Sequence, residues 1–234
     1  MAARRPSYPQ ARAIAVHRDE RSAATGRWLM LGLALIVGFA VVAWSGAGRA
    51  ASVQQNPRQN LPIASPDFAP LEKWSGAIAR DRAAGTAPWQ GFLAEMRGAS
   101  RAAQLVGVNR FVNGTRFVSD AANWGVRDYW AAPGEFFARG GDCEDYAIAK
   151  YLALRALGFP AQALRLLVLI DTLRGRPHAV LLVQGDGRTL VLDNQTDAVR
   201  PWDAVPFYRA LYSLNETGAW IHVSARDVLR LTSN

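Results

Sequence analysis

The sequence predicts an α+β fold, in which helices come first and an antiparallel sheet follows. Two observations predict it: apolar residues recur at helical spacing in the first half of the domain, and short runs rich in Leu, Val and Ile fill the second half. The expected helices cover Leu71–Ala84, Trp89–Gly107 with a continuation through Val108–Val118, and the stretch from Asp142 to Gly158. A short helix within packed loop is expected in Trp124–Phe137.

The expected strands cover residues 163–171, 178–184, 189–194 and 220–223, and a terminal helix is expected to begin at Ser224. The second and third runs are close enough to form a hairpin, whose register depends on the turn. With Gly185-Asp186 as the central pair, His178 lies opposite Asp193; with Asp186-Gly187, Asp193 is its diagonal neighbour. Both registers place the two side chains on one face of the hairpin, whereas a three-residue loop would send Asp193 to the other face.

The composition limits the classes of protein to which the chain can belong. Half of the 234 residues are apolar, which is enough for one domain with a sizeable core. The net charge is +8, but residues 1–27 hold six arginines against two acidic residues. No compact basic run interleaved with aromatic residues follows, so a nucleic-acid-binding protein is disfavoured. The single cysteine, Cys143, excludes an internal disulfide and any multi-thiolate metal site.

The N-terminal part of the chain predicts export. Residues 1–27 form a basic arm, and residues 28–44 are apolar without any charge. At about 1.5 Å per residue, this apolar stretch is short for a membrane span, but it is longer than the apolar region of most signal peptides. An uncleaved anchor and a cleaved signal therefore both stay open. Both place the following chain outside the cytoplasm, because the basic arm stays inside. Residues 45–70 are expected to form a linker and residues 71–234 one domain.

Cys143 is the candidate nucleophile. Asp142 is expected to be the N-cap of the following helix, so Cys143 falls in the first turn, where free N–H groups and the helix dipole favour the thiolate. Asp142, Glu144 and Asp145 crowd the same turn with negative charge, which raises the pKa of a thiol. A bound cation would offset this charge. A lone cysteine is otherwise most often a buried apolar residue.

His178 is the best candidate for the general base among three histidines. His17 lies in the basic arm, and His222 lies in an apolar stretch typical of a core histidine. His178 begins a strand after a loop, where an imidazole can be exposed and aimed. Together with Cys143 and Asp193 it makes a nucleophile, a base and an orienting carboxylate in the chain order Cys, His, Asp. The N–H of Cys143 is one expected oxyanion donor.

Several longer segments resemble the bacterial transglutaminase-like cysteine proteinases, which are periplasmic enzymes with a papain-like α+β fold. The segments are GDCEDYAIAKYLALRALG, HAVLLV and LVLDN, with VNRFVN, WGVRDYW and PGEFF upstream. They lie between Trp89 and Leu214. The resemblance implies a cysteine peptidase with Cys143 as nucleophile, His178 as base and Asp193 as orienting residue, the same three residues that the hairpin geometry favours.

The resemblance also implies a cofactor and partners. The best-known members of the family need calcium, and the implied ligands are Asp142 and Glu144, with Asp145 as a contributor. Those members cleave large surface adhesins, so the resemblance implies an adhesin substrate. It also implies an inner-membrane regulatory receptor. Two other functions stay open: amide transfer by the same three residues, and a non-catalytic binding domain in which the acidic residues hold a structural cation. An indole N–H of Trp124 or Trp130 is a candidate second oxyanion donor.

Overall fold

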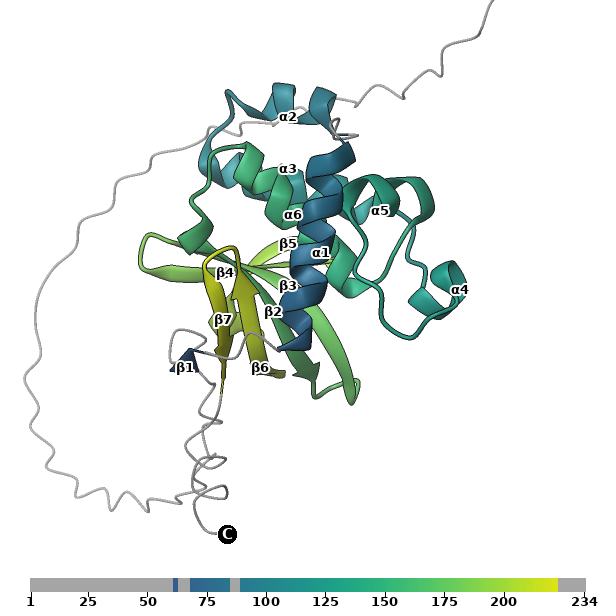
Figure 1. Ribbon diagram of the computed structural model, residues 1–234. Helices are drawn as coiled ribbons and strands as arrows, with labels where there is room; N and C mark the ends of the chain where they lie inside the picture. The colour runs from purple at the N-terminus through teal and green to yellow at the C-terminus, as the bar shows by residue number, and fades with distance from the viewer. Residues whose placement is uncertain (1–60, 63–67, 85–88, 223–234) are drawn as a thin grey trace, which may run out of the picture. The chain divides into compact units, whose positions relative to one another are not determined.

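Six α-helices precede most of the sheet in the part of the chain that the computed structural model describes, residues 61–62, 68–84 and 89–222 (Figure 1). The helices are α1 (Ala69–Ala84), α2 (Gln90–Met96), α3 (Arg101–Asn113), α4 (Asp120–Trp124), α5 (Pro133–Arg139) and α6 (Cys143–Ala156). All of these residues belong to one unit of the chain, Ala50–Asn234. The arrangement of helices and sheet confirms the α+β prediction.

The sheet has seven strands in the order β1-β7-β6-β2-β3-β4-β5, and every neighbouring pair is antiparallel. The strands are β1 (Leu61–Pro62), β2 (Leu164–Asp171), β3 (Arg176–Gly185), β4 (Arg188–Asp193), β5 (Thr196–Pro201), β6 (Tyr208–Asn215) and β7 (Gly218–Ile221). Short 3₁₀ turns, η1 (Ala161–Ala163) and η2 (Trp202–Ala204), connect α6 to β2 and β5 to β6. The sequence predicted β2, β3, β4 and β7 but neither β1, β5 nor β6.

The prediction of one helix over Trp89–Gly107 is wrong, because the chain forms two helices there, α2 and α3. Ser100 begins the second of them as an N-cap, and its Oγ accepts a hydrogen bond from the Ala103 N–H at 3.3 Å. This helix, α3, ends at Asn113, so it does not continue to Val118. The terminal helix expected from residue 224 lies outside the described residues.

No helix among the described residues has the length and apolar character needed to cross a membrane. The apolar stretch at residues 28–44 lies outside those residues.

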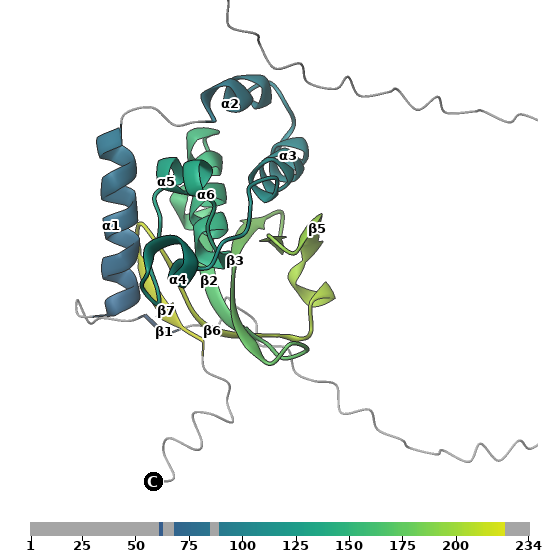
Figure 2. The same ribbon diagram turned by 90° about the vertical axis from the view of Figure 1, so that its right-hand side faces the viewer.

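Both faces of the sheet are covered, which explains why the middle of β3, residues 179–183, is a continuous apolar run. On one face α6 packs across β2 and β3, and it lies between α1 and α3 (Figure 2). On the other face a smaller cluster packs around Trp202 and Tyr208, which follow β5 in the chain. The fully buried side chains of Leu166 and Leu181 face the helices, and those of Leu167 and Leu182 belong to the smaller cluster.

The β3–β4 hairpin adopts the second of the two registers that the sequence left open. Gly185 pairs with Arg188, which makes Asp186 and Gly187 the central residues of the turn. Their φ angles of 46° and 76° are those of a type I′ turn, in which both central residues are left-handed. Leu181 pairs with Leu192. Counting along both strands from that pair makes Asp193 the diagonal neighbour of His178.

Candidate active site

Cys143 is the first residue of α6, as predicted, but the helix is capped differently from the prediction. Asp142 occupies the N-cap position, yet its carboxylate makes no capping hydrogen bond. Instead, the carboxylate of Asp145 reaches back: its Oδ2 accepts from the Asp142 N–H at 3.1 Å, and its Oδ1 accepts from the Ala131 N–H at 2.7 Å. Because Asp145 is fully buried, this pair of bonds fixes the turn that carries the nucleophile.

Gly141 lets this carboxylate approach the backbone. A Cβ at this position would lie 2.1 Å from Oδ2 of Asp145 and 2.9 Å from its Cβ, so any other residue would displace the Asp145 side chain. The backbone of Gly141 is also held, because Val118 N–H donates to its carbonyl at 2.9 Å. The glycine is therefore required by packing against Asp145 rather than by an unusual φ angle.

Gly141→Ala is expected to destabilise the protein by about 1–3 kcal/mol and to lower peptidase activity, because the added methyl group overpacks the turn before Cys143. Urea unfolding followed by circular dichroism measures the first effect. The matched control is Gly134→Ala in α5, where no atom lies within 4 Å of the added Cβ, and this variant should be no less stable than the wild type. Equal stability of the two variants would contradict the role of Gly141.

His178 and Asp193 lie together on the β3–β4 hairpin. Nε2 of His178 is 2.9 Å from Oδ1 of Asp193, and both residues are 5% exposed. Burial raises the pKa of the Asp193 carboxyl, but hydrogen bonds from His178, Tyr208 and the Gln195 N–H outweigh it, so this pKa lies below its usual value. Asp193 is therefore ionised. Because Nε2 is engaged by Asp193, Nδ1 is the imidazole nitrogen left for a nucleophile.

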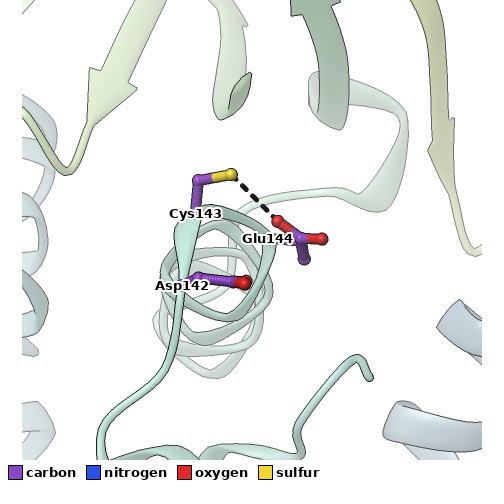
Figure 3. A group of neighbouring side chains, drawn as sticks. All are labelled: Asp142, Cys143 and Glu144. Carbon is purple, nitrogen blue, oxygen red and sulfur yellow. Dashed lines mark hydrogen bonds between the residues drawn. The ribbon is translucent and has the colours of Figure 1, made fainter. Parts of the chain in front are cut away.

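The thiol of Cys143 lies beside the start of the same hairpin. Its Sγ donates a hydrogen bond to Oε2 of Glu144 at 2.9 Å (Figure 3), and the backbone N–H of Ala179, the residue that follows His178, lies close enough to favour the thiolate and so to lower the pKa of the thiol. Burial raises the pKa of the thiol far above its usual value, and the nearby carboxylates of Glu144 and Asp142 add to this effect. A thiolate at this position needs a positive charge nearby.

Five carboxylates gather around the start of α6, and we call them the acidic cluster: Asp120, Asp128, Asp142, Glu144 and Asp145. Oxygen atoms of Asp120, Asp142 and Asp145 lie within 4.8 Å of one another, and so do those of Asp120, Asp128 and Glu144. Burial and then repulsion from Glu144 and Asp145 raise the pKa of Asp142 to about 9, and burial raises that of Asp145 to about 8.

The acidic cluster suits a hard cation. One oxygen of Asp142 and one of Asp120 are buried without a hydrogen-bond partner among the described residues, although buried polar atoms are normally paired. The only cation that forms an ion pair with the cluster in the described part of the chain is Lys73 of α1, which pairs with Asp128. Carboxylate oxygens in this number are the ligands that Ca²⁺ prefers, so the residues fit the implied calcium site.

Asp120 and Asp128 were not predicted from the sequence. They lie at the start of α4 and in the loop after it, and only the folded chain brings them to Glu144. Asp128 belongs to WGVRDYW, one of the segments that carry the family resemblance, but nothing in that segment pointed to a metal ligand. The carboxylate of Asp120 is held by the Tyr129 N–H, which donates to Oδ2 at 2.6 Å.

Other polar residues near Asp193 were also missed. Tyr208 donates from its hydroxyl to Oδ2 of Asp193 at 2.5 Å, and Asn113 donates from its amide to the Asp193 carbonyl at 3.0 Å. Lys150, seven residues after Cys143 on α6, is 1% exposed; burial lowers its pKa to about 7, although the charge of Asp193 acts against this shift. Lys150 and Asn113 lie in segments that carry the family resemblance.

The remaining candidates can be placed as well. His222 is buried, and its Nε2 is 2.9 Å from Oγ of Ser213, as expected of a core histidine. The indole Nε1 of Trp124 is buried without a hydrogen-bond partner among the described residues, and Trp130 is also buried. Either indole as oxyanion donor stays a prediction. His17 lies outside the described residues.

The chain matches the family model of the bacterial transglutaminase-like cysteine proteinases, BTLCP, over residues 92–228. The chain belongs to this family. It is accordingly a cysteine peptidase, and its fold is that of the transglutaminase-like cysteine proteinases. The match covers α3, α6 and the strands that carry His178 and Asp193. A comparison with curated protein sequences found no match.

Solved structures of LapG from Legionella pneumophila are similar to this chain. The calcium-bound form is 25% identical, with a TM-score of 0.53, over 69% of this chain and 99% of LapG. The EGTA-treated form is 29% identical, with a TM-score of 0.54, over 70% of this chain and 89% of LapG. A third LapG structure is 28% identical, with a TM-score of 0.53, over 72% and 94%.

Proposed function

We propose that this cysteine peptidase is a periplasmic endopeptidase that uses Cys143 as nucleophile, His178 as general base and Asp193 as orienting residue, and that it depends on calcium. The observation that carries the proposal is the buried pair of His178 and Asp193, 2.9 Å apart, on a strand whose next N–H, that of Ala179, contacts the Cys143 thiol. A nucleophile at a helix N-terminus beside an oriented imidazole is the arrangement that thiol-dependent hydrolysis requires.

The mechanism follows from these positions. Nδ1 of His178 takes the Cys143 proton, and the thiolate attacks the carbonyl carbon of a substrate peptide bond. The negative oxygen of the tetrahedral intermediate accepts from the Cys143 N–H and from a second donor, for which the indole of Trp124 or Trp130 is proposed. His178 then protonates the leaving amine, and a thioester remains. His178 deprotonates a water molecule that hydrolyses the thioester, and the carboxylic acid product leaves. Asp193 holds the imidazole throughout.

Calcium binding is proposed at the acidic cluster, with Asp142, Glu144, Asp120 and Asp128 as ligands. Asp145 contributes to the site indirectly, because both of its oxygens already accept backbone hydrogen bonds at the helix start. A bound calcium ion supplies positive charge next to a thiol that must become an anion. The fit of the carboxylates supports this proposal, and so does the similarity to LapG, which has been solved in calcium-bound and EGTA-treated forms.

A peptidase acts on a protein substrate, and we propose a large cell-surface adhesin as that substrate. The support is the family resemblance alone. The same resemblance supports an inner-membrane receptor that regulates access to the enzyme. We further propose the domain organisation given by the sequence: a basic arm, an apolar anchor or signal at residues 28–44, a linker, and the peptidase domain from residue 71.

Asp193→Asn is expected to lower kcat by up to about 10⁴-fold and to leave a measurable residue of activity, because the thiolate and imidazolium can still form with a less firmly held ring. Cleavage of a fluorescently labelled unfolded protein measures kcat. The exposed Asp203, in η2, provides a matched control, and Asp203→Asn should cleave at the wild-type rate. Wild-type activity in Asp193→Asn would remove Asp193 from the proposed triad.

A reporter enzyme fused after Asn234 is expected to reach the periplasm, because the basic arm stays in the cytoplasm and the chain after residue 44 is exported. Alkaline phosphatase, which needs periplasmic disulfides, reports that location. The mass of the purified protein then separates an uncleaved anchor from a cleaved signal. An inactive alkaline phosphatase fusion, with the protein retained in the cytoplasm, would overturn the proposed location.

A further inference from the structure

Tyr208, the first residue of β6, contacts both residues of the His178–Asp193 pair. Its hydroxyl donates to Oδ2 of Asp193 at 2.5 Å. Its ring lies 5.7 Å from the imidazole of His178, measured between centroids, with the two planes tilted by 55°. The side chain is 4% exposed, so water does not compete freely for the hydroxyl. The hydroxyl group therefore belongs to the buried surroundings of the proposed triad.

The two oxygens of Asp193 have different partners. Oδ1 accepts from the Gln195 N–H at 3.0 Å and faces Nε2 of His178. Oδ2 accepts from the Tyr208 hydroxyl. Without that hydroxyl, Oδ2 would be a buried anionic oxygen that has lost its side-chain donor. Rotation of the carboxylate toward another donor or a positive charge would then lower its free energy. The buried Lys150 of α6, when it is protonated, supplies such a charge, since it interacts electrostatically with Asp193.

The main chain at Asp193 is already fixed from the opposite side of the hairpin. The side-chain amide of Asn113 in α3 donates to the carbonyls of Asp193 and Thr196, each at 3.0 Å, and the amide of Asn109 donates to the Thr196 carbonyl at 2.9 Å. The turn between β4 and β5 cannot move without breaking these bonds. The carboxylate can still rotate, and that rotation is opposed by the Gln195 N–H at Oδ1 and by the Tyr208 hydroxyl, which is the side-chain donor at Oδ2.

The hydroxyl can only act as a donor toward Asp193. Burial raises the pKa of the Tyr208 hydroxyl far above its usual value, and the hydrogen bond to Asp193 and the charges of Asp193 and Asp171 raise it further, against a smaller effect of Arg174. The Asp193 carboxylate is ionised and accepts. The proton therefore stays on the tyrosine at neutral pH.

We propose that Tyr208 is a positioning residue, whose hydroxyl fixes the Asp193 carboxylate so that Oδ1 faces the imidazole of His178. The inference rests on the proposed function of that pair. It adds a fourth side chain, from a strand that the sequence did not predict, to the three that carry out the chemistry. Because Tyr208 is buried and its hydroxyl is bound to Asp193, its effect is expected in the rate of the chemical steps and not in substrate binding.

Tyr208→Phe removes the hydroxyl and keeps the ring that packs between Phe207 and His178. The variant is expected to lower kcat about tenfold with an unchanged KM, because a hydrogen bond to a charged orienting group is lost while the substrate contacts remain. The matched control is Tyr151→Phe. Tyr151 is fully buried, and its hydroxyl also donates to a carboxylate, that of Glu216, at 3.2 Å in the β6–β7 turn, outside the proposed triad.

Tyr151→Phe should keep the wild-type kcat even if its unfolding temperature falls. An equal loss of kcat in both variants would mean that losing any buried tyrosine hydroxyl loosens the fold, and it would overturn the positioning role. Tyr208→Leu, which also removes the ring, should lose at least as much kcat as Tyr208→Phe; a smaller loss would overturn the role too. Thermal unfolding of each variant verifies that it is folded under the assay conditions.

A second readout needs no substrate. The ultraviolet absorbance of the thiolate, taken as the difference from Cys143→Ala, should be lower in Tyr208→Phe than in the wild type, because a poorly held imidazole stabilises the thiolate less. If the wild type cleaves no protein at all, the proposed function fails and this inference fails with it. If the wild type is active and Tyr208→Phe has the same kcat and the same thiolate absorbance, only the inference is overturned.

Discussion

Cys143→Ala is expected to abolish protein cleavage completely, because no other thiol exists in the chain and the thioester intermediate cannot form without one. His178→Gln should lower kcat at least about 10³-fold, since the thiol then has no base to take its proton. Both variants should fold: the Cys143 thiol contacts Glu144 and the Ala179 N–H, and neither contact builds the sheet. Cleavage of a labelled unfolded protein is the measurement, and circular dichroism verifies the fold.

The matched control for the histidine is His222→Gln. His222 is as deeply buried as His178 and is hydrogen-bonded to Ser213, but it lies near the other edge of the sheet, after β7. This variant should keep the wild-type kcat, whatever its stability. Full activity in Cys143→Ala would refute cysteine-dependent cleavage, and equal losses in the two histidine variants would refute the assignment of His178 as the base.

Chelation of calcium with EGTA is expected to lower cleavage at least about 100-fold, and added calcium should restore it. The reason is charge. At an effective dielectric constant near 20, two like charges about 6 Å apart repel by roughly 3 kcal/mol. The dipole at a helix N-terminus stabilises a negative charge by only ~0.3–1 kcal/mol, which does not offset this repulsion. The carboxylates of Asp142 and Glu144 lie beside a buried thiol that must lose its proton, so the thiolate is strongly disfavoured unless a cation is bound.

Asp142→Ala and Glu144→Ala should each require much more calcium for half-maximal activity, because each removes a proposed ligand. Asp203→Asn, which changes an exposed acidic residue of η2, should leave the calcium dependence unchanged. Magnesium should substitute poorly, since it prefers a tighter octahedral shell and keeps its water molecules. Calcium should also raise the unfolding temperature, as any ligand of the folded state does. Unchanged cleavage after exhaustive chelation would show that the acidic cluster is not a metal site.

The parts of the site that depend on short-range patterns could be predicted from the sequence. The two glycines before Asp142 and the glycine at position 158, whose φ is 83°, mark both ends of the helix that begins with Cys143. The hairpin is local as well, because a two-residue turn dictates which residues of β3 and β4 share a face. The shared face of His178 and Asp193 therefore follows from the sequence for either two-residue turn, and the structure excludes the three-residue loop that would have separated them.

The parts that depend on distant segments could not be predicted. The strand β6 alternates imperfectly, and β5 is an edge strand with several exposed residues, so neither gives a clear strand pattern. Tyr208 was missed for this reason. Asp120 and Asp128 reach Glu144 only because the loops around α4 fold back against α6, and sequence spacing carries no information about that contact. The helix break before Ser100 was hidden by continuous helical spacing on both sides.

The rate at which iodoacetamide alkylates Cys143 tests the central claim most directly, since it reports the thiolate without any assumption about the substrate. In the presence of calcium, the thiol of the wild-type protein should react faster at neutral pH than free cysteine does, and EGTA or His178→Gln should slow the reaction strongly. A thiol that reacts more slowly than free cysteine, with and without calcium, would contradict an activated nucleophile and favour a non-catalytic domain with an inert buried cysteine.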